Sequence, residues 1–472
     1  MLEKHTTLKI GSYIGADGVD LWKEQKWKRE IESHQVLVMT AAILLQILRH
    51  GYIRVHHINL LVFDECHRGV GNHDYAQIMR DYVHHENVKY RPVIFGMTAS
   101  IINGKCAQNK IESKIKALES LMLSRVATTK YQHQLEKYST KPEESIVFYQ
   151  QVGADYCVQS IINVLLQYNN GIVSEDELDK ISNSIQKDCL SAYEELGYFG
   201  LYQIICLLIA QHKSIHNIAL YDKSKAAVYG QILNKLKKMQ AMCEKYHFHS
   251  CQYADRHSKL KTLLDNLRKY QITMADDEDH FCGIIFVEKR CIAMTLSHIL
   301  NNLADYDQSL STFKCDFVVG HGTGVNSSQV MTNMTYKQQA CSIDKFRRHK
   351  INLLVATNVI EEGIDVPKCN IVIRYNEIKT FSSYMQSKGR ARAQMAHFIM
   401  MIDDHGKDEK VRQIRQWAAC QDLLQRHCHD REPGHEDDDA LTNLQLNLIP
   451  PFTIPSTGSK ITMSNSISIL NW

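Results

Sequence analysis

The chain has 472 residues, which is enough for two to four domains with substantial cores. Its 55 Lys and Arg residues nearly balance 52 Asp and Glu residues. The resulting net charge of +3 excludes a globally basic protein, so any contact with nucleic acid must come from a local stripe. The 14 cysteines form no Cys-x-x-Cys pair and are interpreted as reduced thiols of a cytoplasmic protein, and no apolar stretch is long enough to cross a membrane.

Residues 1–125 are predicted to alternate strands with helices. An apolar run at 36–40 leads into a helical stretch at 41–50, and further apolar runs follow at 58–63 and 93–98. Short continuous apolar runs of this kind indicate buried parallel strands, and open α/β sheets bind their ligands at the carboxyl ends of such strands.

The second of these runs ends in the tetrapeptide Asp64-Glu65-Cys66-His67. At a strand end, Asp64 can hold Mg²⁺, usually through water, and Glu65 can orient and deprotonate an attacking water molecule. We therefore interpret the tetrapeptide as part of a phosphate-cleaving site. Taken alone, it is also compatible with the start of a solvated loop.

From about Tyr138 to Tyr253 the apolar pattern is helical, with Val158, Ile161 and Leu165 at three- and four-residue spacing. Strands are then predicted at 282–287, 315–319, 353–355, 371–373 and 398–402, separated by helix-length segments that indicate a second parallel α/β sheet. A helical run follows Asp404 through Leu424, and the acidic stretch at 436–439 is predicted to be a solvated linker.

Four segments resemble, in the same order, motifs II, III, V and VI of superfamily 2 helicases: 64–67, 98–100, 357–365 and 386–392. Further segments at 98–106, 282–288, 319–324 and 384–392 resemble the helicase module of Dicer proteins over nearly the whole chain. The resemblance implies an α/β fold with two RecA-like parallel-sheet lobes, the first of them incomplete, an all-α insertion and a helical pincer. It places a partial first lobe at 1–125, a linker and the all-α insertion at 126–254, and the second lobe at 255–404. The pincer and acidic linker would occupy 405–440, and a dimerisation domain would begin at 441–472.

The resemblance also implies roles for individual residues. ATP and Mg²⁺ would bind between the lobes, with catalytic groups at Asp64, Glu65, Gln386, Arg390 and Arg392, and further nucleotide contacts at His67, Gly363 and Asp365. Asp64 would hold Mg²⁺, and the two arginines would reach the γ-phosphate. Sequence-independent contacts to double-stranded RNA would come from Thr40, Thr98, Ser100, Gly320, His321 and Thr357.

Several of these assignments have plain structural alternatives. Thr40 could cap the following helix, and Gly320-His321-Gly322 could be an ordinary turn. The helical insertion could be a spacer, whereas the resemblance implies that it grips double-stranded RNA and offers a site for a dsRNA-binding protein. The Cys and His residues at 243–257 lack the paired spacing of a structural zinc site, and we do not predict one.

Motif I, Gly-x-x-x-x-Gly-Lys-Ser/Thr, is not found in the 472 residues. This motif supplies the loop and lysine that hold the β- and γ-phosphates. We expect the chain to be truncated at its N-terminus and its parent to be an RNA-dependent ATPase that handles double-stranded RNA or pre-miRNA in small-RNA production. The alternatives are a non-catalytic platform for RNA recognition and partner docking, and an innate-immune RNA-sensor helicase.

Overall fold

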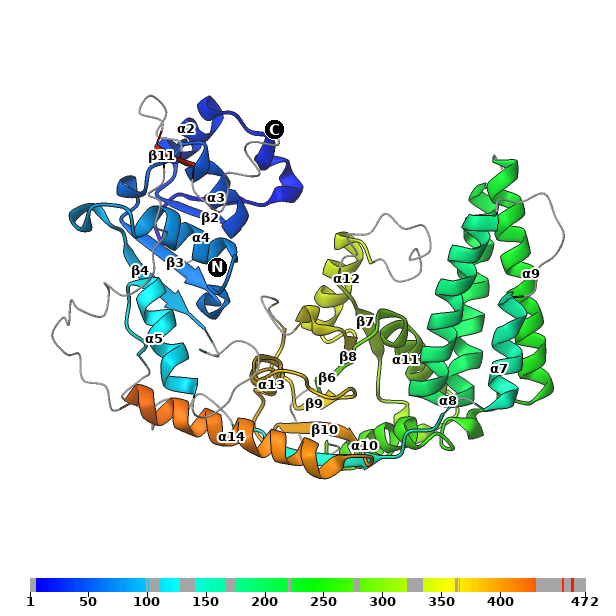
Figure 1. The fold of residues 1–472 in the computed structure, drawn as a ribbon. Helices are drawn as coiled ribbons and strands as arrows, with labels where there is room; N and C mark the ends of the chain where they lie inside the picture. Colours follow the sequence, from blue (N-terminus) through cyan, green and yellow to red (C-terminus); the bar gives the residue numbers. More distant parts are fainter. Residues whose placement is uncertain are drawn as a thin grey trace. The chain divides into compact units, whose positions relative to one another are not determined.

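The computed structural model describes residues 6–98, 101, 110–127, 141–153, 155–166, 175–219, 222–274, 281–320, 334–360, 364, 366–429, 452–453 and 460–461. The chain divides into two compact units (Figure 1). Unit 1 comprises Met1–Lys130, Thr380–Ser382 and Gln416–Trp472, and unit 2 comprises Tyr131–Lys379 and Ser383–Arg415.

Unit 1 contains two pairs of parallel strands. Strand β1 (Ile10–Tyr13) pairs with β2 (Val36–Met39), and β3 (Leu60–Asp64) pairs with β4 (Val93–Met97). The predicted strands and the helix after β2 are confirmed, whereas β1 was not predicted. The α-helices described in its N-terminal part, residues 6–98 and 110–127, are α2 (Glu24–Ser33), α3 (Ala41–Arg49), α4 (Asp74–Ile78) and α5 (Ile111–Met122).

The β3–β4 pair is buried on one face only. Phe63 of β3 points into the core of unit 1, together with buried residues of α3 and α4. Alternate residues on the other face are exposed apolar side chains, namely Leu60, Val62, Val93, Phe95 and Met97. Since parallel sheets are usually covered on both faces, this lobe covers its sheet incompletely within the described residues.

Unit 2 is built on a six-stranded parallel sheet with the order β5-β10-β9-β6-β8-β7. Its strands are β5 (Glu143–Tyr149), β6 (Gly283–Phe286), β7 (Cys315–Val318), β8 (Leu353–Ala356), β9 (Ile371–Arg374) and β10 (His397–Asp403). The three central strands β9, β6 and β8 are buried along their whole length, as their continuous apolar runs predict. Helices α10 (Ser258–Met274), α11 (Arg290–Leu303), α12 (Tyr336–Arg347) and α13 (Phe381–Lys388) accompany the sheet.

Strand β5 corrects the prediction of a helical pattern from about Tyr138. Residues 143–149 form an edge strand that runs parallel to β10 over its full length. The segment Ile146-Val147-Phe148-Tyr149 carries β-branched and aromatic side chains, which favour a strand. The first element of the predicted all-α region therefore belongs to the second sheet.

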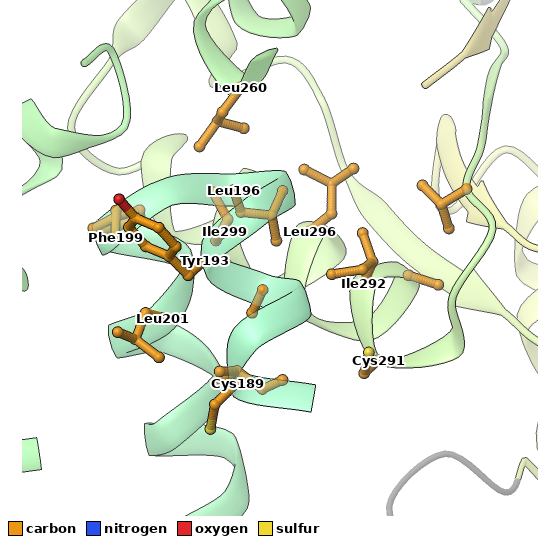
Figure 2. Packing of buried hydrophobic residues seen from close by; sticks show 14 of the residues in the cluster. Cys189, Tyr193, Leu196, Phe199, Leu201, Leu260, Cys291, Ile292, Leu296 and Ile299 are labelled. Atoms are coloured by element: carbon orange, nitrogen blue, oxygen red, sulfur yellow. The ribbon is translucent and has the colours of Figure 1, made fainter. Parts of the chain in front are cut away.

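The helical part of unit 2 follows β5. It consists of α7 (Tyr156–Ile162), α8 (Glu175–Ala219) and α9 (Lys223–Lys245), and the long helices α8 and α9 lie side by side (Figure 1). One continuous core joins it to the sheet: Leu196 and Phe199 of α8 lie with Leu296 and Ile299 of α11 in the same buried cluster (Figure 2).

The second half of α8 leaves the straight path at Gly197. This glycine has a backbone φ of 73°, a value that residues other than glycine rarely adopt. A Cβ atom built on it would lie 2.6 Å from Cβ of His257, just before α10. Glycine is therefore needed at this position for two reasons. It permits the bend in α8, and it leaves room for His257 in the segment that leads into the second lobe.

The predicted helical run after Asp404 is α14 (Lys407–His429). Farther on, Phe452–Thr453 (β11) and Lys460–Ile461 (β12) form a short antiparallel pair, and the predicted acidic linker lies outside the described residues. Among the helices that the structure describes, none is both long and apolar enough to span a bilayer.

Candidate functional site

Asp64 and Glu65 lie at the carboxyl end of β3, where the strand turns sharply. Asp64 is the last strand residue, its side chain is exposed, and its Oδ1 accepts the backbone N–H of Glu65 at 3.1 Å. Glu65 itself has φ 51° and ψ 48°, a left-handed conformation that is uncommon outside glycine. Such an outlier at a strand end is typical of functional sites, because the surrounding structure must hold it in place.

Tyr75 holds this turn from α4. Its hydroxyl donates to the backbone carbonyl of Asp64 at 2.8 Å, and its ring packs edge-on against Phe63 with centroids 4.8 Å apart. Burial raises the pKa of Tyr75, and the nearby Asp64 carboxylate raises it further, so the phenol keeps its proton and remains a donor. Sequence reasoning missed this residue, because a tyrosine in a polar segment after the tetrapeptide carries no signal of its own.

His67 and Thr98 connect the tetrapeptide to the end of β4. Nδ1 of His67 lies 2.7 Å from Oγ1 of Thr98, and that hydroxyl donates to Oε2 of Glu65 at 3.2 Å. His67 is 2% exposed, and its burial lowers its pKa although Glu65 opposes the shift. The imidazole is therefore neutral near pH 7, and the network assigns its proton to Nδ1, which donates to Thr98.

The approach of the two strand ends also depends on Gly96. A Cβ atom at this position of β4 would lie 2.8 Å from Sγ of Cys66. Burial raises the pKa of the Cys66 thiol, which is therefore a packing group rather than a nucleophile. Gly96 therefore leaves room for the Cys66 side chain to pack against the end of β4.

The predicted RNA contacts of unit 1 have different surroundings. Thr40 precedes α3 and is exposed, but its side chain makes no capping hydrogen bond, so the capping alternative does not account for it. The hydroxyl of Thr98 is engaged with Glu65 and His67. Ser100 lies outside the described residues.

In unit 2, helix α13 and the turn after it carry the predicted catalytic residues. Gln386 and Arg390 are 6% and 9% exposed, and Nη1 of Arg390 donates to the backbone carbonyl of Ile364 at 2.9 Å. Arg392 is exposed, and its Nε donates to the carbonyl of Gly389 at 2.6 Å. Arg390 is thus tied to the segment that precedes Asp365, while Gly363 and Asp365 themselves lie outside the described residues.

Gly320 and Thr357 lie together at the carboxyl edge of the second sheet. They follow the neighbouring strands β7 and β8, whose residues Val318 and Ala356 are paired. The backbone N–H of Thr357 donates to the carbonyl of Val318 at 3.1 Å, and its side chain is 9% exposed. The structure therefore brings these two predicted RNA contacts to one edge, and His321 lies outside the described residues.

The carboxylates of the first site could contribute ligands to a divalent cation. The Asp64 carboxylate is exposed at a strand end, and carboxylate oxygens are ligands that Mg²⁺ prefers. Glu65 stands beside it with a carboxylate held by Thr98, as a general base needs to be held. Within the described part of the chain, no three Cys, His, Asp or Glu side chains gather in an arrangement that could hold a metal ion by themselves.

Comparison with known proteins identifies two helicase domains. Residues 2–108 match the DEAD/DEAH box helicase family, and residues 258–394 match the helicase conserved C-terminal domain. The chain is similar to Endoribonuclease Dicer of Gallus gallus, with 29% identity over 99% of the chain and 27% of that protein. It is also similar to Endoribonuclease Dicer of Danio rerio, with 29% identity over 99% of the chain and 28% of that protein. Endoribonuclease dcr-1 of Caenorhabditis elegans is 26% identical over 100% of the chain and 26% of that protein.

The chain thus spans about a quarter of the length of these relatives. The matched regions contain both strand-end sites, one in each helicase domain. The chain therefore carries two helicase domains in this order, on parallel-sheet lobes with a helical insertion, and along its whole length it is similar to the helicase part of Dicer proteins.

Proposed function

We propose that this chain is the helicase module of a Dicer-like endoribonuclease, and that it binds double-stranded RNA and couples this binding to ATP hydrolysis. The observation that carries the proposal is the hydrogen-bonded connection from His67 through Thr98 to Glu65. It links the carboxylate that would activate water to the end of the neighbouring strand, so that a movement of one alters the other.

In this proposal Asp64 binds Mg²⁺ through water and Glu65 accepts the proton of the attacking water. Mg²⁺, when bound, neutralises charge on the phosphates. Gln386, Arg390 and Arg392 of the second helicase domain are assigned to the nucleotide phosphates by the resemblance, because guanidinium groups stabilise the charge that develops during phosphoryl transfer. Gly363, Asp365 and His67 are assigned to the nucleotide on the resemblance alone.

The RNA contacts in this proposal are made to the backbone rather than to bases. A double-stranded RNA helix hides its bases in a narrow major groove, so shape, phosphates and 2′-hydroxyls are what a protein can read. Thr40, Gly320 and Thr357 are proposed to contact the backbone, together with His321 and Ser100. The module would then recognise or translocate precursors for a nuclease elsewhere in a cytoplasmic protein, and its helical insertion would be a docking site for a dsRNA-binding protein.

A second candidate is a non-catalytic platform that recognises RNA and docks partners. It is favoured by one observation, namely that the phosphate-loop motif is not among the 472 residues. The two candidates agree on RNA binding and differ on ATP turnover. They are therefore separated by measuring RNA binding on the chain itself, and ATP turnover on the chain extended at its N-terminus by a segment that carries motif I, which we call the completed chain.

The test compares the completed chain with its Glu65→Gln variant. Loss of a general base should reduce RNA-stimulated ATP turnover by roughly 10²- to 10⁴-fold, with RNA binding preserved. Glu32→Gln, an exposed glutamate of the same unit, is the matched control and should change neither quantity. Turnover that is the same in the Glu65→Gln variant would remove Glu65 from the mechanism, and no turnover in the unmodified completed chain would favour the platform.

A further inference from the structure

Glu144 of the edge strand β5 is bonded to two residues of α13, the helix that leads into Arg390. Its Oε2 accepts the hydroxyl of Tyr384 at 2.6 Å, and its Oε1 lies 2.6 Å from Nζ of Lys388. Residues four apart on a helix lie on the same face, one turn apart. The Glu144 carboxylate therefore contacts two successive turns of one face of α13.

The contact is partly withdrawn from water. Nζ of Lys388 lies 3.3 Å from the Tyr384 hydroxyl and stands over the Tyr384 ring, 5.2 Å from its centroid. Tyr384 is fully buried, and the side chains of Lys388 and Glu144 are 16% and 30% exposed. Charge-assisted hydrogen bonds in such surroundings are stronger than those of exposed ion pairs, whose net contribution is small.

The other face of α13 carries the residues assigned to catalysis. At 3.6 residues per turn, Gln386 lies roughly 200° around the helix from Tyr384. Arg390 comes in the turn directly after the helix, where its guanidinium is bonded to Ile364. The hydrogen bond and ion pair that Glu144 makes with Tyr384 and Lys388 therefore fix the rotation of α13 about its axis. That rotation sets the direction in which Gln386 and Arg390 point.

We propose that Glu144 is the positioning residue that fixes α13, and with it Arg390 and Arg392 after the helix, for their action on the nucleotide. This inference rests on the proposed function, and it assigns a role to a strand that the sequence pattern did not reveal. Strand β5 is also the first described strand after the residues of unit 1. This strand thus contacts, through Glu144, the helix that leads into Arg390.

The role of Glu144 is tested first by hydrogen exchange on the 472-residue chain. Glu144→Gln removes the charge that holds Lys388, and we expect the amides of 381–390 to exchange about tenfold faster or more, because this loss is worth roughly 1.4 kcal/mol or more. Glu143→Gln is the matched control, since Glu143 is the adjacent residue, its side chain is 76% exposed and its partner is His397 of β10. Exchange at 381–390 that is equal in both variants would overturn the proposal.

Two further measurements separate positioning from a general structural role. In the completed chain, Glu144→Gln should lower kcat for ATP about tenfold and leave KM within about twofold, because the arginines act on the transition state. The double variant Glu144→Lys with Lys388→Glu should restore protection and part of kcat, since it reverses the ion pair. If the unmodified completed chain turns over ATP and Glu144→Gln leaves kcat unchanged, the inference fails while the proposed function stands. Absence of turnover in the unmodified completed chain would overturn the proposed function and, with it, the role of Glu144 at the nucleotide.

Discussion

Oγ1 of Thr98 lies 2.7 Å from Nδ1 of His67, and the same hydroxyl donates to the Glu65 carboxylate. The resemblance assigns Thr98 to RNA, yet its polar group is bonded within the strand-end site. We therefore propose that Thr98 couples the end of β4 to Glu65, because a movement of Thr98 would change its hydrogen bond to the Glu65 carboxylate.

Replacing Thr98 by valine keeps the shape of the side chain and removes the hydroxyl that joins His67 to Glu65. A hydrogen bond to a charged group is worth roughly 1.5–3 kcal/mol, so we expect RNA-stimulated ATP turnover of the completed chain to fall about tenfold or more. Thr98→Ser restores the hydroxyl and should retain most of the stimulation. The measurement is the ratio of turnover with and without a short RNA duplex. An unchanged ratio in Thr98→Val would show that this coupling is not used.

Tyr75→Phe tests the hydrogen bond from the Tyr75 hydroxyl to the backbone carbonyl of Asp64. The phenyl ring keeps its contact with Phe63, so the variant removes only the hydroxyl. We expect the free energy of unfolding to fall by about 0.5–1.5 kcal/mol, as for the loss of one hydrogen bond, in urea denaturation of the 472-residue chain. Tyr90→Phe, at a ring that is 53% exposed, is the control and should have little effect. Equal stabilities of the two variants would contradict a stabilising role of this hydrogen bond.

The central strands of the second sheet could be predicted from the sequence because burial on both faces leaves an unmistakable continuous apolar run. Ile371-Val372-Ile373, for example, has no polar residue, and it is wholly buried between two neighbours. Asp64 and Glu65 could be placed at a strand end because a continuous apolar run precedes them, although β3 is buried on one face only. Such runs predict the strand and its end, but they do not predict the side chains that support them.

The missed features are those whose signals are weak or come from distant residues. Strand β5 is an edge strand with charged and half-buried positions, so its pattern did not stand out from the helical region after it. Glu144 meets Lys388 across 244 positions, by the difference of their numbers, and no local pattern encodes such a pair. The left-handed turn at Glu65 is likewise imposed by its surroundings, because glutamate has no intrinsic preference for it.

Gly197→Ala tests the junction between α8 and α10. Alanine would need the left-handed φ of 73° and would bring its Cβ within 2.6 Å of His257, so both backbone strain and overlap oppose it. We expect a loss of roughly 1–3 kcal/mol or more in the free energy of unfolding of unit 2.

The matched control is Gly230→Ala in the middle of α9. A Cβ there would be 3.5 Å from the His216 ring, an ordinary contact, and the backbone is helical. Alanine should therefore stabilise the helix by roughly 0.5–1 kcal/mol. Chemical denaturation of both variants measures the difference, and a Gly197→Ala protein as stable as Gly230→Ala would contradict the role assigned to this glycine.

His257, which packs on Gly197, should make unit 2 sensitive to acid. Burial lowers the pKa of His257 from 6.5 to about 4; the positive charge of Lys259 adds to the shift and Glu195 opposes it. Between these values the unfolded chain binds a proton that the folded protein does not, so stability is full above pH 6.5 and is lost as the pH falls toward 4, by up to about 1.4 kcal/mol per pH unit. His257→Asn keeps an acceptor for the backbone N–H of Leu260 and cannot take up this proton. Urea denaturation at a series of pH values should show a shallower loss for His257→Asn, and identical slopes for both proteins would mean that His257 is protonated in the folded state.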